Sequence, residues 1–84
     1  MRLDKFLKVS RLVKRRTVAT ELCNAGLVMI NNKIAKPATA IKVHDIISIQ
    51  FGAKQVAAKV LHVPEKAVPA QLASTLYLPL DTTP

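Results

Sequence analysis

Basic side chains are concentrated at the start of this 84-residue chain. The first sixteen residues hold seven of them and a single acid, Asp4, a net charge of +6. The seven bases are Arg2, Lys5, Lys8, Arg11, Lys14, Arg15 and Arg16. Guanidinium groups pair with phosphate oxygens through two parallel hydrogen bonds, and lysine attracts them as a point charge. Since neighbouring bases repel one another, this N-terminal cluster predicts a binding site for a polyanion.

The rest of the chain is nearly neutral. Its 68 residues carry six lysines and four acids, so they add only +2 to the total charge of +8. Isolated lysines such as Lys54, Lys59 and Lys66 are most simply solvated surface charges. The concentration of charge at one end therefore indicates a polyanionic partner, as in nucleic-acid-binding proteins.

Aromatic residues are scarce, since Phe6, Phe51 and Tyr77 are the only three. Proteins that bind single-stranded nucleic acid stack its bases on several aromatic side chains. Double-stranded RNA is recognised mostly through its shape and its sugar–phosphate backbone. The composition therefore favours folded RNA as the ligand and predicts little sequence-specific reading.

The remaining reactive side chains form no catalytic pattern. His44 and His62 lie far apart in the sequence, and no acid and nucleophile are arranged around either. Cys23 is the only cysteine, so neither an internal disulfide nor a zinc ligand set is possible, and a reducing compartment is expected. We expect no enzyme activity, no metal or other cofactor, and no small-molecule substrate.

No segment has the composition of a membrane anchor or a secretion signal. The apolar stretches are far shorter than the roughly 20 residues that cross a bilayer. Charges interrupt the N-terminal segment, which excludes a secretory apolar region there. We expect a cytoplasmic protein without membrane association.

Two short helices are expected to position the basic cluster. Apolar residues recur with amphipathic spacing, which predicts a helix over roughly residues 3–9 and a connection through residues 10–16. Thr17 is the expected N-cap of a second helix, and Gly26 is its expected C-terminal stop. The bases then lie on the first helix and on the connection.

Asp4 lies in the first turn of the first predicted helix. A carboxylate there is stabilised by the helix dipole. It could also orient Arg16 or Arg11 by pairing with one of them. We favour a structural or orienting role for Asp4 over direct contact with a ligand.

Strand patterns follow the second helix. Asn31 and Asn32 separate two short apolar segments, and asparagine tolerates the positive φ angles of tight hairpin turns. Gly52 joins two longer segments with alternating character. The four expected strands are residues 27–30, 33–35, 46–51 and 56–63. Two helices followed by four strands predict an α+β fold with a small, mostly antiparallel sheet.

Prolines become frequent after residue 63. We therefore expect residues 1–63 to form one domain and residues 64–84 to form a partly ordered extension. Within the extension, residues 70–77 suit a brief helix or an edge segment. The last few residues are expected to be loose.

Five segments of the chain form an ordered series. They are Arg2-Leu3-Asp4-Lys5-Phe6-Leu7, Arg11, Arg16-Thr17-Val18-Ala19, Gly26-Leu27-Val28-Met29-Ile30-Asn31 and Val43-His44-Asp45-Ile46-Ile47. In this order and spacing they resemble the S4 RNA-binding motif, over about residues 1–50. Residues 1–16 are more specifically similar to the RqcP family, stand-alone S4 proteins of bacterial ribosome-associated quality control. The bacterial heat-shock S4 proteins are a related family.

Two positions depart from the S4 pattern. The family usually has Asn-Gly where this chain has Asn31-Asn32, and Gly-Asp where it has His44-Asp45. Both changes put a side chain at a turn with positive φ, where Asn and His are among the less penalised residues. We expect a small strain cost and the same S4-type αL fold.

The resemblance implies a non-catalytic factor that binds ribosomal RNA of the large subunit and peptidyl-tRNA on obstructed subunits. It also implies cooperation with the quality-control factor that adds C-terminal alanine tails to stalled nascent chains. The seven bases would contact RNA. Asp4, Thr17, Gly26 and Asn31 would orient or shape the site.

Other functions are compatible with parts of the sequence. A heat-shock-type S4 protein would bind large subunits with nascent chains without taking part in tailing. A DNA-binding helix-turn-helix could use residues 17–26, although the bases precede the helix that should read the DNA. A membrane-surface helix would use residues 3–9. An accessory subunit of an RNA-modifying enzyme would co-purify with that enzyme.

Overall fold

Helices precede most of the strands in the computed structural model, which describes residues 1–66 and 68–80. The first six elements are α1 (Leu3–Val9), α2 (Arg16–Asn24), β1 (Val28–Ile30), β2 (Lys33–Ile34), β3 (Ile46–Phe51) and β4 (Lys54–Val60). A 3-10 helix, η1 (Ala70–Leu76), and β5 (Tyr77–Leu80) follow. The predicted α+β class, two short helices followed by an antiparallel sheet, is confirmed.

The strands form one sheet in the order β2-β1-β3-β4-β5, and each neighbouring pair is antiparallel. β3 and β4 make the longest pairing, from Ile46 opposite Lys59 to Phe51 opposite Lys54. β4 starts two residues earlier than predicted, because Gly52-Ala53 alone forms the turn that closes the hairpin. The sheet therefore has a long central hairpin with shorter strands on both sides.

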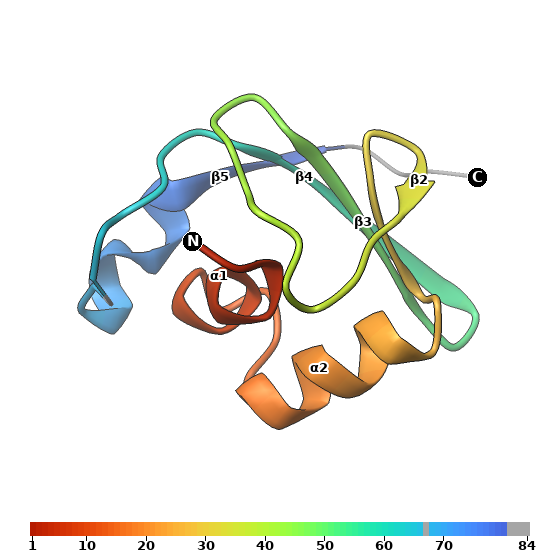
Figure 1. The fold of residues 1–84 in the computed structure, drawn as a ribbon. Coiled ribbons are helices and arrows are strands. Elements are labelled where there is room, and N and C mark those ends of the chain that lie inside the picture. The colour runs from red at the N-terminus through yellow and green to blue at the C-terminus, as the bar shows by residue number, and fades with distance from the viewer. Residues whose placement is uncertain (67, 81–84) are drawn as a thin grey trace.

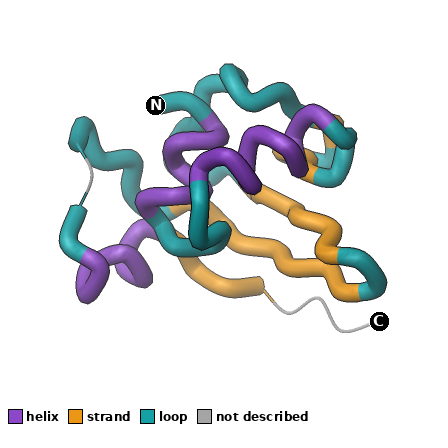
Figure 2. The backbone as a smooth tube through the Cα atoms, turned by 90° about the horizontal axis from the view of Figure 1, so that it is seen from below, coloured by secondary structure: helices purple, strands orange, loops and turns teal. Residues whose placement is uncertain are grey.

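Both α-helices lie on the same face of the sheet, as Figures 1 and 2 show from two directions. α1 contributes Leu3, Phe6 and Leu7, none of which has exposed surface. These side chains belong to one apolar cluster with buried residues of the sheet such as Ile47 and Ile49. Fully burying a side chain of this kind contributes about 1.5–3 kcal/mol. The apolar side of α1 is thus anchored, and its basic side faces away from the sheet.

α2 begins earlier than the sequence suggested, so Thr17 is not its N-cap. Arg15 occupies that position with an extended backbone, and its side chain makes no capping hydrogen bond. The Ala19 N–H donates to the Arg15 carbonyl at 3.1 Å, which starts the helical ladder before Thr17. The earlier start places Arg16 in the first turn, where it pairs with Asp4, in place of a threonine cap worth about 1 kcal/mol. Thr17 lies exposed in the first turn.

α2 ends at Gly26 as predicted. The Gly26 N–H donates to the Cys23 carbonyl at 3.1 Å, and the Leu27 N–H donates to the Leu22 carbonyl at 3.0 Å. These two bonds form a Schellman motif, in which the residue after the C-cap is left-handed. Gly26 has a φ of +75°, a conformation that costs a residue with a side chain about 1–2 kcal/mol. Its expected role as the helix stop is confirmed.

The C-terminal extension adds a strand that the sequence did not predict. β5 pairs with β4, and η1 buries Ala73 and Leu76. Leu76 joins the same apolar cluster as α1, and its carbonyl accepts hydrogen bonds from the Leu61 and His62 N–H groups. That residues 1–63 form a domain by themselves stays a prediction. The looseness predicted for the last few residues concerns 81–84, which lie outside the described residues.

Candidate nucleic-acid interface

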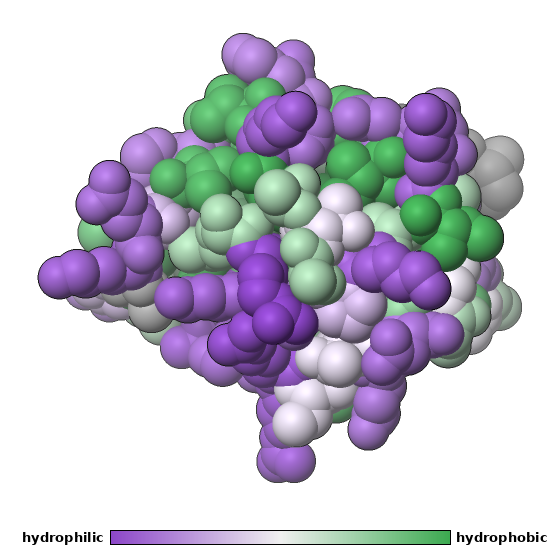
Figure 3. Space-filling view, in the orientation of Figure 1, coloured by the Kyte–Doolittle hydropathy of each residue, from purple (hydrophilic) through white to green (hydrophobic). Residues whose placement is uncertain are grey.

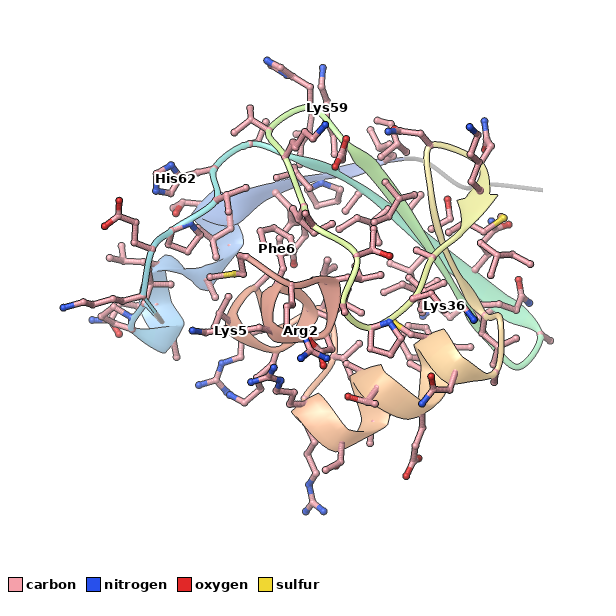
Figure 4. The ribbon with its side chains drawn as sticks, in the orientation of Figure 1. Arg2, Lys5, Phe6, Lys36, Lys59 and His62 are labelled. Atoms are coloured by element: carbon pink, nitrogen blue, oxygen red, sulfur yellow. The ribbon has the colours of Figure 1, made fainter. Side chains whose placement is uncertain are left out.

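The N-terminal cluster lies on α1, on the start of α2 and on the connection between them. Arg2, Arg11, Lys14, Arg15 and Arg16 are exposed, and Lys5 and Lys8 are half-buried. Figure 3 shows a strongly hydrophilic patch over the area that α1 and the start of α2 occupy in Figure 1. In Figure 4, Arg2 and Lys5 lie in this area, whereas Lys59 lies at the top of the view and His62 at the upper left. Phe6 points from α1 toward the sheet in the same view.

Asp4 is a buried acceptor that connects the two helices. Its residue is only 3% exposed. Oδ1 lies 3.3 Å from Nε of Arg2 and 3.4 Å from Nη2 of Arg16. The Thr20 hydroxyl donates to Oδ2 at 3.3 Å, and the Lys5 backbone N–H donates to Oδ1 at 2.8 Å. One carboxylate thus fixes two arginines from different helices relative to each other.

The partners of Asp4 were only partly visible in the sequence. Arg16, and not Arg11, is the distant base that pairs with it, and Arg2 is a second partner. The side chains of Arg2 and Arg16 remain 54% and 48% exposed. Since a guanidinium group has five N–H donors, each arginine keeps donors that can reach a phosphate.

The other five bases of the cluster have no acidic partner in the described part of the chain. Within residues 1–66 and 68–80, the ion pairs are those that Asp4 makes with Arg2 and Arg16. The bases without a carboxylate partner in that part of the chain are Lys5, Lys8, Arg11, Lys14 and Arg15. Their uncompensated charge creates a positive potential that attracts phosphate.

Arg11 has a left-handed backbone, with a φ of +65°. It follows Ser10, the C-cap of α1, and its N–H donates to the Lys8 carbonyl at 3.1 Å. The Val13 N–H then donates to the Leu7 carbonyl at 3.0 Å. An arginine therefore stands where a helix stop usually has glycine. With no glycine in this segment, the sequence pattern did not reveal the turn.

A loop far along the sequence caps the start of α1. Its N-cap, Arg2, makes no side-chain capping bond. Instead, the Leu3 N–H donates to the Thr39 carbonyl at 2.8 Å, and the Asp4 N–H donates to the Pro37 carbonyl at 3.1 Å. These bonds satisfy helix-end N–H groups that would otherwise lack partners. The loop thereby fixes the first turn of α1, which contains Asp4 and directly follows Arg2.

Asn31 links the first hairpin turn to the start of β3. Asn31 and Asn32 have φ angles of +52° and +69°. Asn31 Nδ2 donates to Asp45 Oδ1 at 3.1 Å, and its Oδ1 accepts the Ile46 N–H at 2.9 Å. His44, just before Asp45, has a φ of +78°, so the positive φ expected at Asn32 and His44 is confirmed. The link to Asp45 was not predicted, because it depends on the pairing of strands.

Cys23 is buried in α2 with 2% of its surface exposed. Burial raises the pKa of its thiol to about 11, and the negative charge of Asp4 adds to the rise. The thiol is therefore neutral near pH 7, and a neutral thiol is a poor nucleophile. Among the described residues, no group of three or more His, Cys, Asp and Glu side chains is placed to hold a metal ion. No described helix is long and apolar enough to cross a membrane.

Comparison with known proteins matches the S4 domain family model to residues 1–47. The chain belongs to the S4 domain family. The matched segment of the S4 domain contains both α-helices, β1, β2 and all seven bases of the cluster. The buried Asp4 and its two arginine partners therefore lie within the S4 domain.

Relatives of this S4 domain extend the match beyond the family model. The chain is 51% identical over 77 residues to the RQC P-site tRNA stabilizing factor of Halalkalibacterium halodurans, covering 92% of this chain and 86% of that protein. A trimeric structure of heat shock protein 15 from Vibrio cholerae has a TM-score of 0.85 at 26% identity, covering 95% of this chain and 81% of the other. The solution structure of a hypothetical protein, HP1423, has a TM-score of 0.82 at 34% identity, with 99% and 100% covered. The predicted S4-type fold and the likeness to both S4 protein families are confirmed.

Proposed function

We propose that this S4 domain is a non-catalytic RNA-binding factor of ribosome-associated quality control. It binds ribosomal RNA of the large subunit and peptidyl-tRNA on obstructed subunits. It supports C-terminal alanine tailing of stalled nascent chains, together with the tailing factor, in the cytoplasm. The observation that carries the proposal is the pairing of Arg2 and Arg16 with one buried carboxylate, Asp4, beside five bases that have no carboxylate partner among the described residues.

The arrangement suits the recognition of phosphate. Asp4 already restricts the rotamers of Arg2 and Arg16, so binding a phosphate costs these side chains less conformational entropy. The name of the Halalkalibacterium halodurans relative, RQC P-site tRNA stabilizing factor, supports tRNA as one ligand. A stabilizing factor makes and breaks no covalent bonds. It shifts the tRNA toward the conformation that the factor binds more tightly.

The test is sedimentation of the tagged protein through sucrose gradients at low and raised salt, with tRNA probed in every fraction. We expect it to travel with large subunits and tRNA at low salt and to be released at raised salt, because phosphate contacts weaken as salt increases. The Lys14→Glu/Arg15→Glu variant should stay at the top of both gradients. Lys54→Glu/Lys66→Glu is the matched control, with the same charge change outside the cluster, and should travel as the wild type does. A wild-type protein that stays at the top at low salt would exclude the ribosomal role.

The likeness to heat shock protein 15 supports a second candidate function. In this alternative the protein binds large subunits that carry nascent chains and has no part in tailing. Cells that lack the protein distinguish the two functions through the alanine content of their stalled chains. Loss of the tails supports the proposed function, whereas intact tails together with normal cosedimentation support the alternative.

A further inference from the structure

An apolar groove opens within the basic surface of the S4 domain. It is open to solvent and has a volume of about 510 Å³ between the α1–α2 connection, the first turns of α2 and the end of β3. Its lining residues are Leu12, Val13, Lys14, Arg15, Val18 and Phe51. Sites for small ligands typically enclose about 300–1,000 Å³, so the groove has room for one compact group.

The floor of the groove is apolar and fixed in place. Leu12 and Phe51 are partly buried and pack against the main apolar cluster, and Val13 belongs to that cluster. Val18 is 38% exposed on α2. Contiguous apolar surface that is rimmed by charged residues marks an interaction site more often than scattered apolar residues do.

Lys14 and Arg15 form the charged rim of the groove. Both are exposed, and neither has a carboxylate partner within residues 1–66 and 68–80. Arg16, the next residue, is held by Asp4, so an RNA strand bound at Arg16 passes this rim. An RNA duplex presents mainly phosphates and sugars to a protein, and these leave an apolar floor unfilled. An unstacked nucleotide carries both a flat base and charged phosphates, so it complements the floor and the rim together.

We propose that the groove receives one unstacked nucleobase of the bound RNA, while Lys14 and Arg15 hold the flanking phosphates. The base lies against Phe51, as unstacked bases lie against aromatic side chains in other RNA-binding proteins. One aromatic residue suffices for one base, although the scarcity of aromatics argued against a platform for several. The inference rests on the proposed RNA-binding function and names the feature that the site selects, a bulged or looped nucleotide in a folded RNA.

The test compares three RNA hairpins that differ at one position. The first stem is fully paired, the second carries a single unpaired adenosine, and the third carries an abasic residue at that place. We expect the wild-type protein to bind the second about tenfold more tightly than the other two, the size of one base–aromatic stacking contact. With 2-aminopurine in place of the adenosine, binding should change the fluorescence of the probe.

Variants of the groove separate the contribution of the base to RNA affinity from the contribution of the phosphates. Val18→Ser removes part of the apolar wall without changing charge, so it should abolish the preference for the bulge and leave binding of the paired stem unchanged. Val43→Ser is the matched control, because Val43 is 44% exposed and lies outside the groove. Phe51→Leu keeps an apolar side chain in the core but removes the aromatic face, and it should lower the preference in the same way. Thermal unfolding shows whether each variant is folded.

Three results would overturn the nucleobase site. Equal binding of the three hairpins, with binding still lost in Lys14→Glu/Arg15→Glu, excludes the site and leaves the proposed function standing. A wild-type protein that binds neither the hairpins nor tRNA excludes both. Tighter binding of an acidic, leucine-rich peptide than of the bulged hairpin, lost in Val18→Ser, assigns the groove to a protein partner instead.

Discussion

At the scale of single residues, one buried carboxylate organises the candidate interface. Asp4 accepts hydrogen bonds from two guanidinium groups, one hydroxyl and one backbone N–H. The number and density of the bases were visible in the sequence, and so was an orienting role for Asp4. The choice of Arg16 over Arg11 was not, because it depends on how α2 packs beside α1.

Asp4→Asn should lower both stability and RNA affinity. Asparagine keeps the size of the side chain, but it removes the charge that Arg2 and Arg16 face. Because both arginines are about half exposed, we expect a moderate loss of about 1–2 kcal/mol in the free energy of unfolding. Urea unfolding and filter binding to tRNA measure the two effects. Glu21→Gln, an exposed acid without an ion pair in the described part of the chain, is the control; normal tRNA affinity in Asp4→Asn would contradict the orienting role.

Two substitutions at Arg11 should separate the effect of its backbone conformation from the effect of its charge. Arg11→Gly removes the charge and relieves a left-handed conformation, so stability should rise by up to about 1 kcal/mol. Arg11→Ala removes the charge but keeps the strain, so stability should not rise. Both should weaken tRNA binding and make the salt dependence less steep, because one phosphate contact is lost. A glycine variant that is clearly less stable than the alanine variant would disprove the strain.

At the scale of elements, short-range sequence patterns predicted the helices more completely than the strands. The bounds of α1 and the stop at Gly26 follow from apolar spacing and one glycine, both of which act within a few residues. Arg15 and not Thr17 is the N-cap of α2, and the pairing of Arg16 with Asp4 in that first turn is visible only in the tertiary structure. β5 was missed because it contains Pro79. Proline is tolerated there because β5 is an edge strand, where no further strand needs its N–H.

His44→Gly should stabilise the turn that leads into β3. His44 has a φ of +78°, which glycine adopts without strain, so we expect a gain of up to about 1 kcal/mol. His62→Gly is the matched control, because His62 is also exposed and its φ is not positive. It should gain nothing or lose stability. Thermal unfolding of both variants checks this, and equal effects would show that the turn at His44 stores no strain.

At the scale of the whole molecule, the C-terminal segment completes the sheet and the core on which the S4 helices rest. β5 lies along β4, and Leu76 is 1% exposed within the cluster that contains Phe6. The basic surface and the C-terminal segment are therefore connected through one core, although they lie at opposite ends of the sequence.

Leu76→Ala should destabilise the protein by about 2–4 kcal/mol, because it leaves a cavity in that core. Leu72→Ala, on the same 3-10 helix but 48% exposed, should change stability by less than about 0.5 kcal/mol. Urea unfolding measures both. At temperatures where Leu76→Ala is folded, its tRNA affinity should equal that of the wild type. A small effect of Leu76→Ala would mean that the extension adds little to the core.

The caps of α1 also set the order in which the chain can fold as it is synthesised. The first N–H groups of α1 bond to carbonyls of Pro37 and Thr39. These bonds can form only when the chain closes a loop of more than thirty residues. Synthesis proceeds from the N-terminus, so these carbonyls emerge from the ribosome well after the bases do. The first turn of α1, which contains Asp4, can have both of its caps only then. The fully capped α1 therefore forms only after residues far beyond the basic cluster have been synthesised.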